Sequence, residues 1–155
     1  MFFSRQIVKR RDGRFGLRLG DGERMLLRSL YDDLADLLVD PDDPAVRRLF
    51  PPAHADPESE EQYRELVRDQ LVAGRAQALD IVRATLSEKI LTAEEADAWL
   101  RGLNDLRLVL GTRLDVTEET DFELELDSSE RGRELAVYAY LTWLQEQFVE
   151  ALSPE

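Results

Sequence analysis

The segment 97–114 constrains the fold more than any other part of the sequence. Its apolar residues recur at the spacing of one helical face, and they are Trp99, Leu103, Leu106 and Leu110. Leu100, Leu108 and Leu114 widen this face, so the pattern predicts a largely buried helix at the centre of the molecule. Four polar residues follow its edge: Arg101, Asn104, Asp105 and Arg107. Because buried polar groups need partners, we interpret them as a structural polar network in which Arg101 and Asp105 pair across one turn.

Signals for helix ends predict two further helices before this segment. Asp21 is expected to cap a helix that Pro41 ends, with an inward stripe of Met25, Leu26, Leu30, Leu34, Leu37 and Leu38. A short helical turn is expected after Asp43-Pro44. Asp56-Pro57-Glu58 then starts a long helix that runs to about Glu88. Thr92 and Glu95 form a capping box that opens the central helix.

The last helix is expected to start at Asp127-Ser128-Ser129-Glu130 and carries two apolar stripes instead of one. The first stripe is Val137, Leu141, Leu144, Phe148 and Leu152, and the second is Tyr140, Trp143 and Gln147. Two stripes indicate either a central place in a bundle or a surface for a protein partner. We therefore regard Tyr140, Trp143 and Phe148 as a candidate protein interface.

Residues 5–20 have the pattern of a β-hairpin. Asp12-Gly13 is a turn signal, and the apolar residues Phe15, Leu17 and Leu19 alternate with Gly16 and Arg18. A two-residue Asp12-Gly13 loop would place five basic side chains on one face, namely Arg5, Lys9, Arg11, Arg14 and Arg18. Like charges that face each other across a hairpin are destabilising, so we expect a compensating partner.

An acidic run supplies a candidate for that partner. Residues 115–130 hold eight acidic residues and no basic one, and Phe122, Leu124 and Leu126 alternate with acids. One interpretation is that 120–127 docks beside the hairpin as a third strand, with its acids over the basic face. The other is a solvated acidic loop.

Composition narrows the class of protein. The 155 residues are 43% hydrophobic, which fits one domain over 1–155, with a hairpin at 5–20 and a helical bundle at 21–152. The expected class is mainly α, with four main helices and a small β element. No apolar run approaches the roughly 18 to 20 residues that cross a bilayer, so we expect a cytoplasmic protein without membrane contact. Without cysteine the chain has no thiol switch.

The sequence offers little for catalysis. It has no glycine-rich phosphate loop, no His-Glu-x-x-His and no Gly-x-Ser-x-Gly, and the acidic run lacks the glycine that an EF-hand loop needs. We therefore expect no enzyme activity, metal or cofactor. A remote alternative is an enzyme that uses Asp105 and Arg107 in a bundle pocket.

Several blocks of sequence resemble one known family. They are Arg10–Phe15, Leu49–Ala53, Ala98–Leu114 and Tyr138–Glu146, and together they extend over nearly the whole chain. The resemblance is to an actinomycete family of unknown function that includes the AosR-like oxidative-stress transcriptional regulators. It implies regulation of transcription through contact with DNA or with a transcription-machinery protein such as a sigma factor. Redox sensing in that family is attributed to a pair of cysteines, which this chain lacks, so the resemblance extends to the regulator class alone.

The charge distribution suggests how such a regulator would bind. The net charge is −13, yet residues 1–30 hold eight basic residues against three acidic ones. The basic hairpin is therefore a candidate binding surface for an anionic partner, either DNA or a protein. The alternatives are that the acidic run neutralises it internally, or that the protein is an adaptor or homodimer that uses the last helix.

Overall fold

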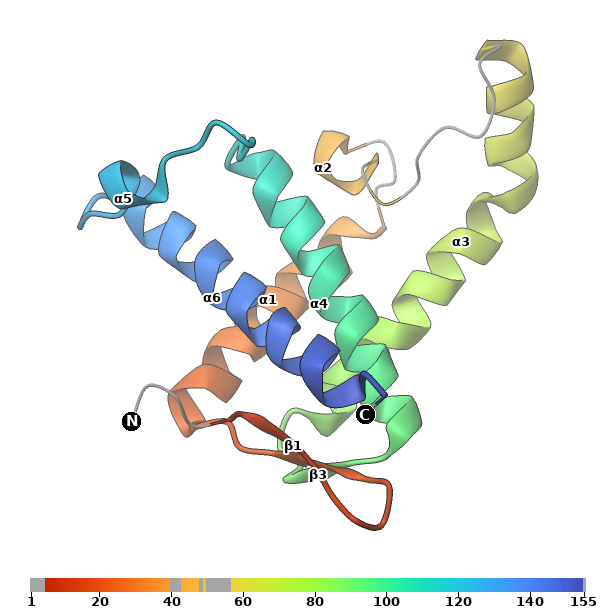
Figure 1. Ribbon diagram of the computed structural model, residues 1–155. Helices are drawn as coiled ribbons and strands as arrows, with labels where there is room; N and C mark the ends of the chain where they lie inside the picture. The colour runs from red at the N-terminus through yellow and green to blue at the C-terminus, as the bar shows by residue number, and fades with distance from the viewer. Residues whose placement is uncertain (1–4, 40–42, 48, 50–56, 155) are drawn as a thin grey trace.

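A computed structural model of the chain describes residues 5–39, 43–47, 49 and 57–154 (Figure 1). Four long helices dominate it: α1 (Asp21–Leu37), α3 (Pro57–Thr85), α4 (Ala93–Arg113) and α6 (Glu130–Leu152). Two single turns of helix, α2 (Pro44–Arg47) and α5 (Phe122–Glu125), lie in the connections. The strands β1 (Ile7–Lys9), β2 (Phe15–Leu17) and β3 (Ile90–Leu91) form one antiparallel sheet in the order β1-β2-β3. The expected class, mainly α with four main helices and an N-terminal hairpin, is confirmed.

Helix α4 is the central element, as its sequence predicts. It packs against α3 and α6 and also contacts α1 and α2. Trp99, Leu103 and Leu106 are buried, and Leu110 is half-buried. The predicted capping box is confirmed, because the Thr92 hydroxyl accepts the Glu95 N–H at 3.1 Å and Glu95 Oε1 accepts the Thr92 N–H at 2.8 Å. This box fixes where the central helix begins.

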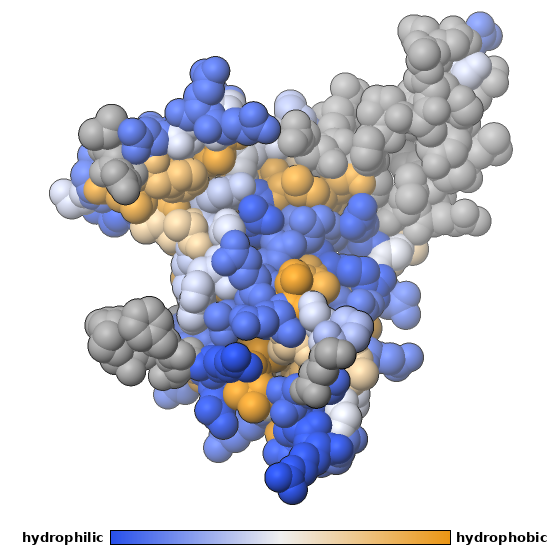
Figure 2. All heavy atoms as spheres, in the orientation of Figure 1, coloured by the Kyte–Doolittle hydropathy of each residue, from blue (hydrophilic) through white to orange (hydrophobic). Residues whose placement is uncertain are grey.

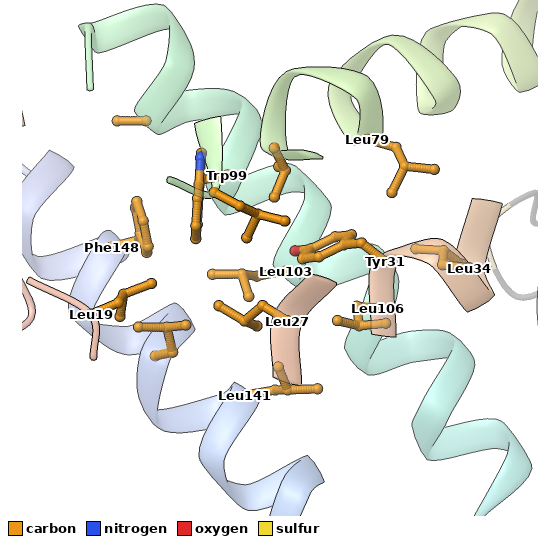
Figure 3. Packing of buried hydrophobic residues seen from close by; sticks show 14 of the residues in the cluster. Leu19, Leu27, Tyr31, Leu34, Leu79, Trp99, Leu103, Leu106, Leu141 and Phe148 are labelled. Atoms are coloured by element: carbon orange, nitrogen blue, oxygen red, sulfur yellow. The ribbon is translucent and has the colours of Figure 1, made fainter. Parts of the chain in front are cut away.

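The core forms where α1, α3, α4 and α6 cross (Figure 3). Trp99 has no exposed surface and stacks on Phe148 with ring centroids 5.5 Å apart. Its indole Nε1 donates a hydrogen bond to the Thr85 hydroxyl at 2.7 Å. The only polar atom of this large side chain is therefore satisfied inside the core.

Helix α1 buries most of the predicted stripe, because Leu34 and Leu38 are buried and Leu30 and Leu37 pack against the core. Leu27, Tyr31 and Leu34 point into the core, whereas Met25 is 73% exposed. The prediction for Met25 was therefore wrong, and Leu27 and Tyr31 were missed. The helix is preceded by Gly20 as its N-cap, with Glu23 accepting the Gly20 N–H at 3.2 Å, so Asp21 is the first helical residue and not the cap.

Helix α3 begins at Pro57, as predicted, and ends at Thr85. Its N-terminal half extends away from the other helices (Figure 1). Its C-terminal half packs against α4, where Ala78, Leu79 and Val82 are buried. No described helix is long and apolar enough to cross a bilayer.

The third strand of the sheet is not the acidic segment. β3 pairs with β2 through Phe15↔Leu91 and Gly16↔Ile90, whereas Phe122–Glu125 is the helical turn α5. The predicted acidic strand is therefore wrong. The short connection between α3 and α4 supplies the strand instead and occupies the free edge of β2. Residues 117–120 form a hydrogen-bonded turn, and Asp127 accepts the Ser129 N–H at 2.9 Å ahead of α6.

Candidate functional site

The turn of the hairpin decides which side chains share a face. The Arg10 N–H donates to the Arg14 carbonyl at 2.8 Å, and Gly13 adopts φ 85°. The loop therefore has three residues, Arg11 to Gly13, and not the two that Asp12-Gly13 predicted. A three-residue loop with a left-handed glycine is a standard hairpin connection. The observed register is Ile7↔Leu17, Val8↔Gly16 and Lys9↔Phe15. It is one residue away from the register that the predicted two-residue loop would give, in which Ile7 lies opposite Arg18.

A shift of one residue moves side chains to the opposite face. Ile7, Phe15 and Leu17 are buried against the helices. Arg5 and Lys9 lie two residues before and after Ile7, so they belong to the same, inner face. Val8, Gly16 and Ile90 are half-buried partners in one row across the other face. Because side chains alternate along a strand, Arg10, Arg14 and Arg18 lie on this same face, on either side of the row. The predicted single face of five basic residues is therefore wrong.

We call the solvent side of the sheet the outer sheet face, formed by Val8, Arg10, Arg14, Gly16, Arg18 and Ile90. All three arginines are exposed, and the hairpin region of the molecular surface is strongly hydrophilic (Figure 2). The row of small and aliphatic residues lies between Arg10 and Arg14 at one end and Arg18 at the other. The face therefore combines an apolar strip with positive charge at both ends.

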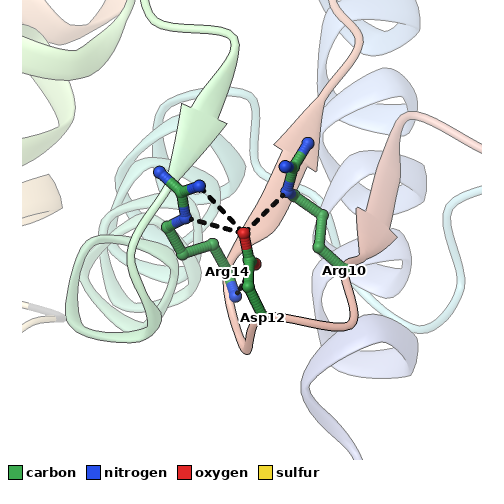
Figure 4. Close-up of polar contacts among 3 residues, drawn as sticks. All are labelled: Arg10, Asp12 and Arg14. Carbon is green, nitrogen blue, oxygen red and sulfur yellow. Dashed lines mark hydrogen bonds and ion pairs between the residues drawn. The ribbon is translucent and has the colours of Figure 1, made fainter.

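Asp12 partly neutralises the positive charge at one end of this face. Its carboxylate lies 2.8 Å from Nη2 of Arg14 and 3.4 Å from Nε of Arg10 (Figure 4). It also accepts the Arg14 N–H at 3.0 Å. These interactions, led by the Arg14 side-chain hydrogen bond, lower the pKa of Asp12 to about 2, so the carboxylate stays ionised at neutral pH. Among the described residues, no carboxylate pairs in this way with Arg18, Arg11 or Lys9.

The acidic run does not cover the hairpin. Helix α5 lies at the opposite end of the molecule from the hairpin (Figure 1). Glu125 pairs with Arg131 at 3.1 Å, and Asp127 interacts with Ser129. The hypothesis that these acids neutralise the basic hairpin is therefore wrong for the described residues. Within the described residues, the predicted basic set contacts α6 through an ion pair of Arg5 with Glu150 at 3.8 Å, between two exposed side chains.

The four polar residues of α4 divide into separate interactions instead of one network. Arg101 pairs with Asp97 at 3.2 Å, and not with Asp105 as predicted. Asn104 and Arg107 both contact Gln145 of α6, at 3.5 Å and 2.6 Å.

Asp105 is the buried member of the four and pairs with Arg75 of α3. The Arg75 Nη1 lies 2.6 Å from the Asp105 carboxylate, and its Nη2 donates to the Leu49 carbonyl at 3.1 Å. Burial raises the pKa of Asp105 to about 6, and the nearby charges of Arg75 and Arg101 oppose that rise. The pair joins α3, α4 and the segment after α2, so its role is structural.

The candidate protein interface on α6 is mostly engaged inside the molecule. Phe148 is fully buried and is not available to a partner, so the prediction that it belongs to a protein interface was wrong. The Tyr140 hydroxyl donates to Glu23 of α1 at 2.6 Å, and burial together with this contact raises its pKa. Trp143 is half-buried beside Tyr140. The homodimer stays a prediction.

Two residues of the sheet region were missed from the sequence. Arg24 donates to the carbonyls of Leu17, Leu19, Leu86 and Glu88, and so ties α1 to β2 and to the chain that leads into β3. Ile90 completes the apolar row of the outer sheet face. An arginine directly after a hairpin and inside the first turn of a helix was the available signal for Arg24.

Comparisons with known proteins place the chain in a family. Residues 4–152 match the model of the family described as Domain of unknown function (DUF2017), and the chain belongs to that family. Proteins named oxidative stress regulator AosR from Mycobacterium tuberculosis and Mycobacterium bovis are 28% identical over 187 residues, with 94% of this chain and 85% of each relative covered. A Mycobacterium leprae protein that also carries the name AosR is 32% identical over 138 residues. That match covers 72% of this chain and 59% of the relative, and no solved structure matches the chain.

Proposed function

We propose that this chain is a non-enzymatic regulator of transcription that binds an acidic surface on a transcription-machinery protein, such as a sigma factor, through the outer sheet face. The names of the AosR relatives support the regulatory class. The observation that carries the binding mode is the row of Val8, Gly16 and Ile90 across the sheet, with Arg14 and Arg18 on either side of it along β2. Protein interfaces commonly combine an apolar centre with arginines, which are enriched among residues that dominate binding energy.

The charges favour a protein over DNA as the partner. The chain has a net charge of −13, which repels the dense, extended negative charge of DNA more strongly than that of a small acidic patch on a protein. The outer sheet face offers three arginines, and two of them already share the Asp12 carboxylate. Non-specific DNA binding relies on many phosphate contacts, whereas an acidic protein surface of limited size needs few.

A binding experiment with a matched control tests this proposal. The labelled protein is titrated with purified RNA polymerase holoenzyme, with free sigma subunit and with random duplex DNA, each across a range of salt. The test variant is Arg14→Glu with Arg18→Glu, on the outer sheet face. The control is Arg5→Glu with Lys9→Glu, which changes the net charge equally on the inner face. Wild type is expected to bind holoenzyme or sigma subunit, the test variant to lose about tenfold or more in affinity, and the control to lose far less.

Three results would count against the proposal. Equal loss in both variants would mean that only net charge matters. Preference for random DNA, with a log–log salt slope of about 0.9 per phosphate, would transfer the function to DNA binding. Absence of binding to all three probes would reject this surface altogether.

A further inference from the structure

A pocket opens between the C-terminal half of α4, the first half of α6 and the chain that connects them. Its inner part has a volume of about 240 Å³ and is lined by Arg107, Gly111, Thr112, Asp115, Thr117 and Tyr138, among others. A shallower hollow shares Arg107, Thr117 and Tyr138 with it and extends over Phe122. On the molecular surface, hydrophobic residues gather in this region, over α5 and the start of α6 (Figure 2). Ligand pockets combine such apolar walls with a few placed polar groups.

The guanidinium of Arg107 is held in place without a described acidic partner. Its Nε donates to the Thr142 hydroxyl at 3.0 Å, and its Nη1 donates to Gln145 at 2.6 Å. Within the described part of the chain, no carboxylate lies within ion-pair distance of Arg107, and its Nη2 makes no hydrogen bond. A half-buried guanidinium with one free edge is suited to a carboxylate, which takes hydrogen bonds from that geometry.

The ring of Tyr138 forms a rigid wall of the same pocket. Phe122 stacks on it with centroids 6.0 Å apart, and the Arg107 Cζ lies 5.5 Å from the ring centroid. A Cβ at Gly111 would come within 3.1 Å of the ring, so the glycine is what lets Tyr138 lie against α4. The ring therefore holds the Arg107 guanidinium by a cation–π contact and fixes where this positive charge lies in the pocket.

Asp115 brings a negative charge to the pocket from a conformation that disfavours most residues. It has φ 54°, directly after the end of α4. The Val116 N–H donates to the Gly111 carbonyl at 2.8 Å, and the Asp115 N–H donates to the Thr112 carbonyl at 3.2 Å. This is the helix-ending motif whose left-handed position is usually glycine. The chain instead carries a carboxylate there.

Arg107 and Asp115 therefore line one pocket without pairing with each other. We propose that the pocket binds a small zwitterion, an amino acid or a close analogue, with its carboxylate on Arg107 and its ammonium on Asp115. One positive and one negative wall match a ligand with both charges, whereas a simple anion would be repelled by Asp115. Glu118, at the outer hollow, adds to the attraction for the ammonium. The site goes beyond the proposed function, since it does not involve the outer sheet face.

Calorimetric titration with the free amino acids, including ω-amino acids, tests the site. For each amino acid that binds, the matched carboxylic acid without the ammonium and the matched amine without the carboxylate are titrated too. Saturable binding of at least one amino acid per chain is expected, with about tenfold or greater loss for either matched analogue. Arg107→Gln and Asp115→Asn are each expected to weaken binding to a similar extent. Arg101→Gln, on the exposed side of the same helix, is the control and should bind as wild type.

Asp115→Asn is the decisive variant, because asparagine tolerates the left-handed conformation and the fold is kept. This variant tests the binding of the ammonium group even if Arg107→Gln melts at a lower temperature. Failure of every amino acid to bind would overturn the proposal. So would equal binding of the matched carboxylic acid, which would indicate an anion site, or unchanged binding by Asp115→Asn.

Discussion

Replacing Trp99 with alanine is expected to lower the free energy of unfolding by about 3 to 5 kcal/mol, the range for deleting a buried aromatic side chain. Trp99 has no exposed surface and stacks on Phe148 with centroids 5.5 Å apart. Its removal opens a cavity at the crossing of α3, α4 and α6 and also leaves the Thr85 hydroxyl without its donor. Urea unfolding followed by far-ultraviolet circular dichroism measures the loss.

The second tryptophan provides a matched control for this prediction. Trp143 is half-buried at the edge of the core, so Trp143→Ala should cost much less than Trp99→Ala. Similar losses for the two variants would contradict the central place of Trp99 in the core.

Asp105 is expected to make the protein lose stability as the pH rises. Its pKa is about 6 in the folded protein, above the ordinary value of 3.8, because burial disfavours the charged form. The folded state therefore binds this proton more tightly than the unfolded state does. The group's favourable contribution is full below pH ~4 and is lost as the pH rises through ~6, by about 2 to 3 kcal/mol in total.

Asp105→Asn isolates this contribution from that of the many other acidic groups. Asparagine does not titrate, so the difference in unfolding free energy between wild type and variant should shift against wild type between pH 4 and pH 7. The ion pair with Arg75 opposes the shift but does not cancel it. A difference that stays constant would show that Arg75 cancels the effect of burial, and one that moves in favour of wild type with rising pH would show that Arg75 outweighs it; either result contradicts the prediction.

Local signals predicted the helices well because each signal acts within a few residues. The capping box at Thr92 and Glu95 and the proline at the start of α3 specify helix ends through neighbouring backbone groups. The apolar spacing of Trp99, Leu103 and Leu106 is strong enough to identify the buried face of α4. In α1 the leucines are so frequent that spacing alone did not distinguish Met25 from Leu27.

The sheet was harder to predict because its geometry depends on contacts between distant residues. An Asp-Gly pair fits both a two-residue and a three-residue loop, and the choice reverses the face of every side chain in one strand. Packing of Ile7 against the helices selects the three-residue loop here. Ile90-Leu91 is too short to be predicted as a strand, whereas the alternation in 122–127 looked like one and became a helical turn.

The partners of the polar side chains were hard to predict for the same reason. Asp105 had a helical neighbour four residues away in Arg101, yet it pairs with Arg75, thirty residues earlier in the chain. The approach of α3 to α4 creates this pair, and no local pattern encodes it. Likewise, the two stripes of α6 did not reveal that Phe148 faces the core while Tyr140 contacts α1.

A comparison of two adjacent positions tests most directly whether the outer sheet face binds the partner. Val8→Asp places a carboxylate in the apolar row, on β1, whereas Lys9→Asp changes the net charge by twice as much on the other face. Both variants are titrated with RNA polymerase holoenzyme and with free sigma subunit at fixed salt. Binding through the outer sheet face predicts that Val8→Asp loses about tenfold or more in affinity and Lys9→Asp much less. A larger loss in Lys9→Asp would contradict it and assign the interaction to net charge alone.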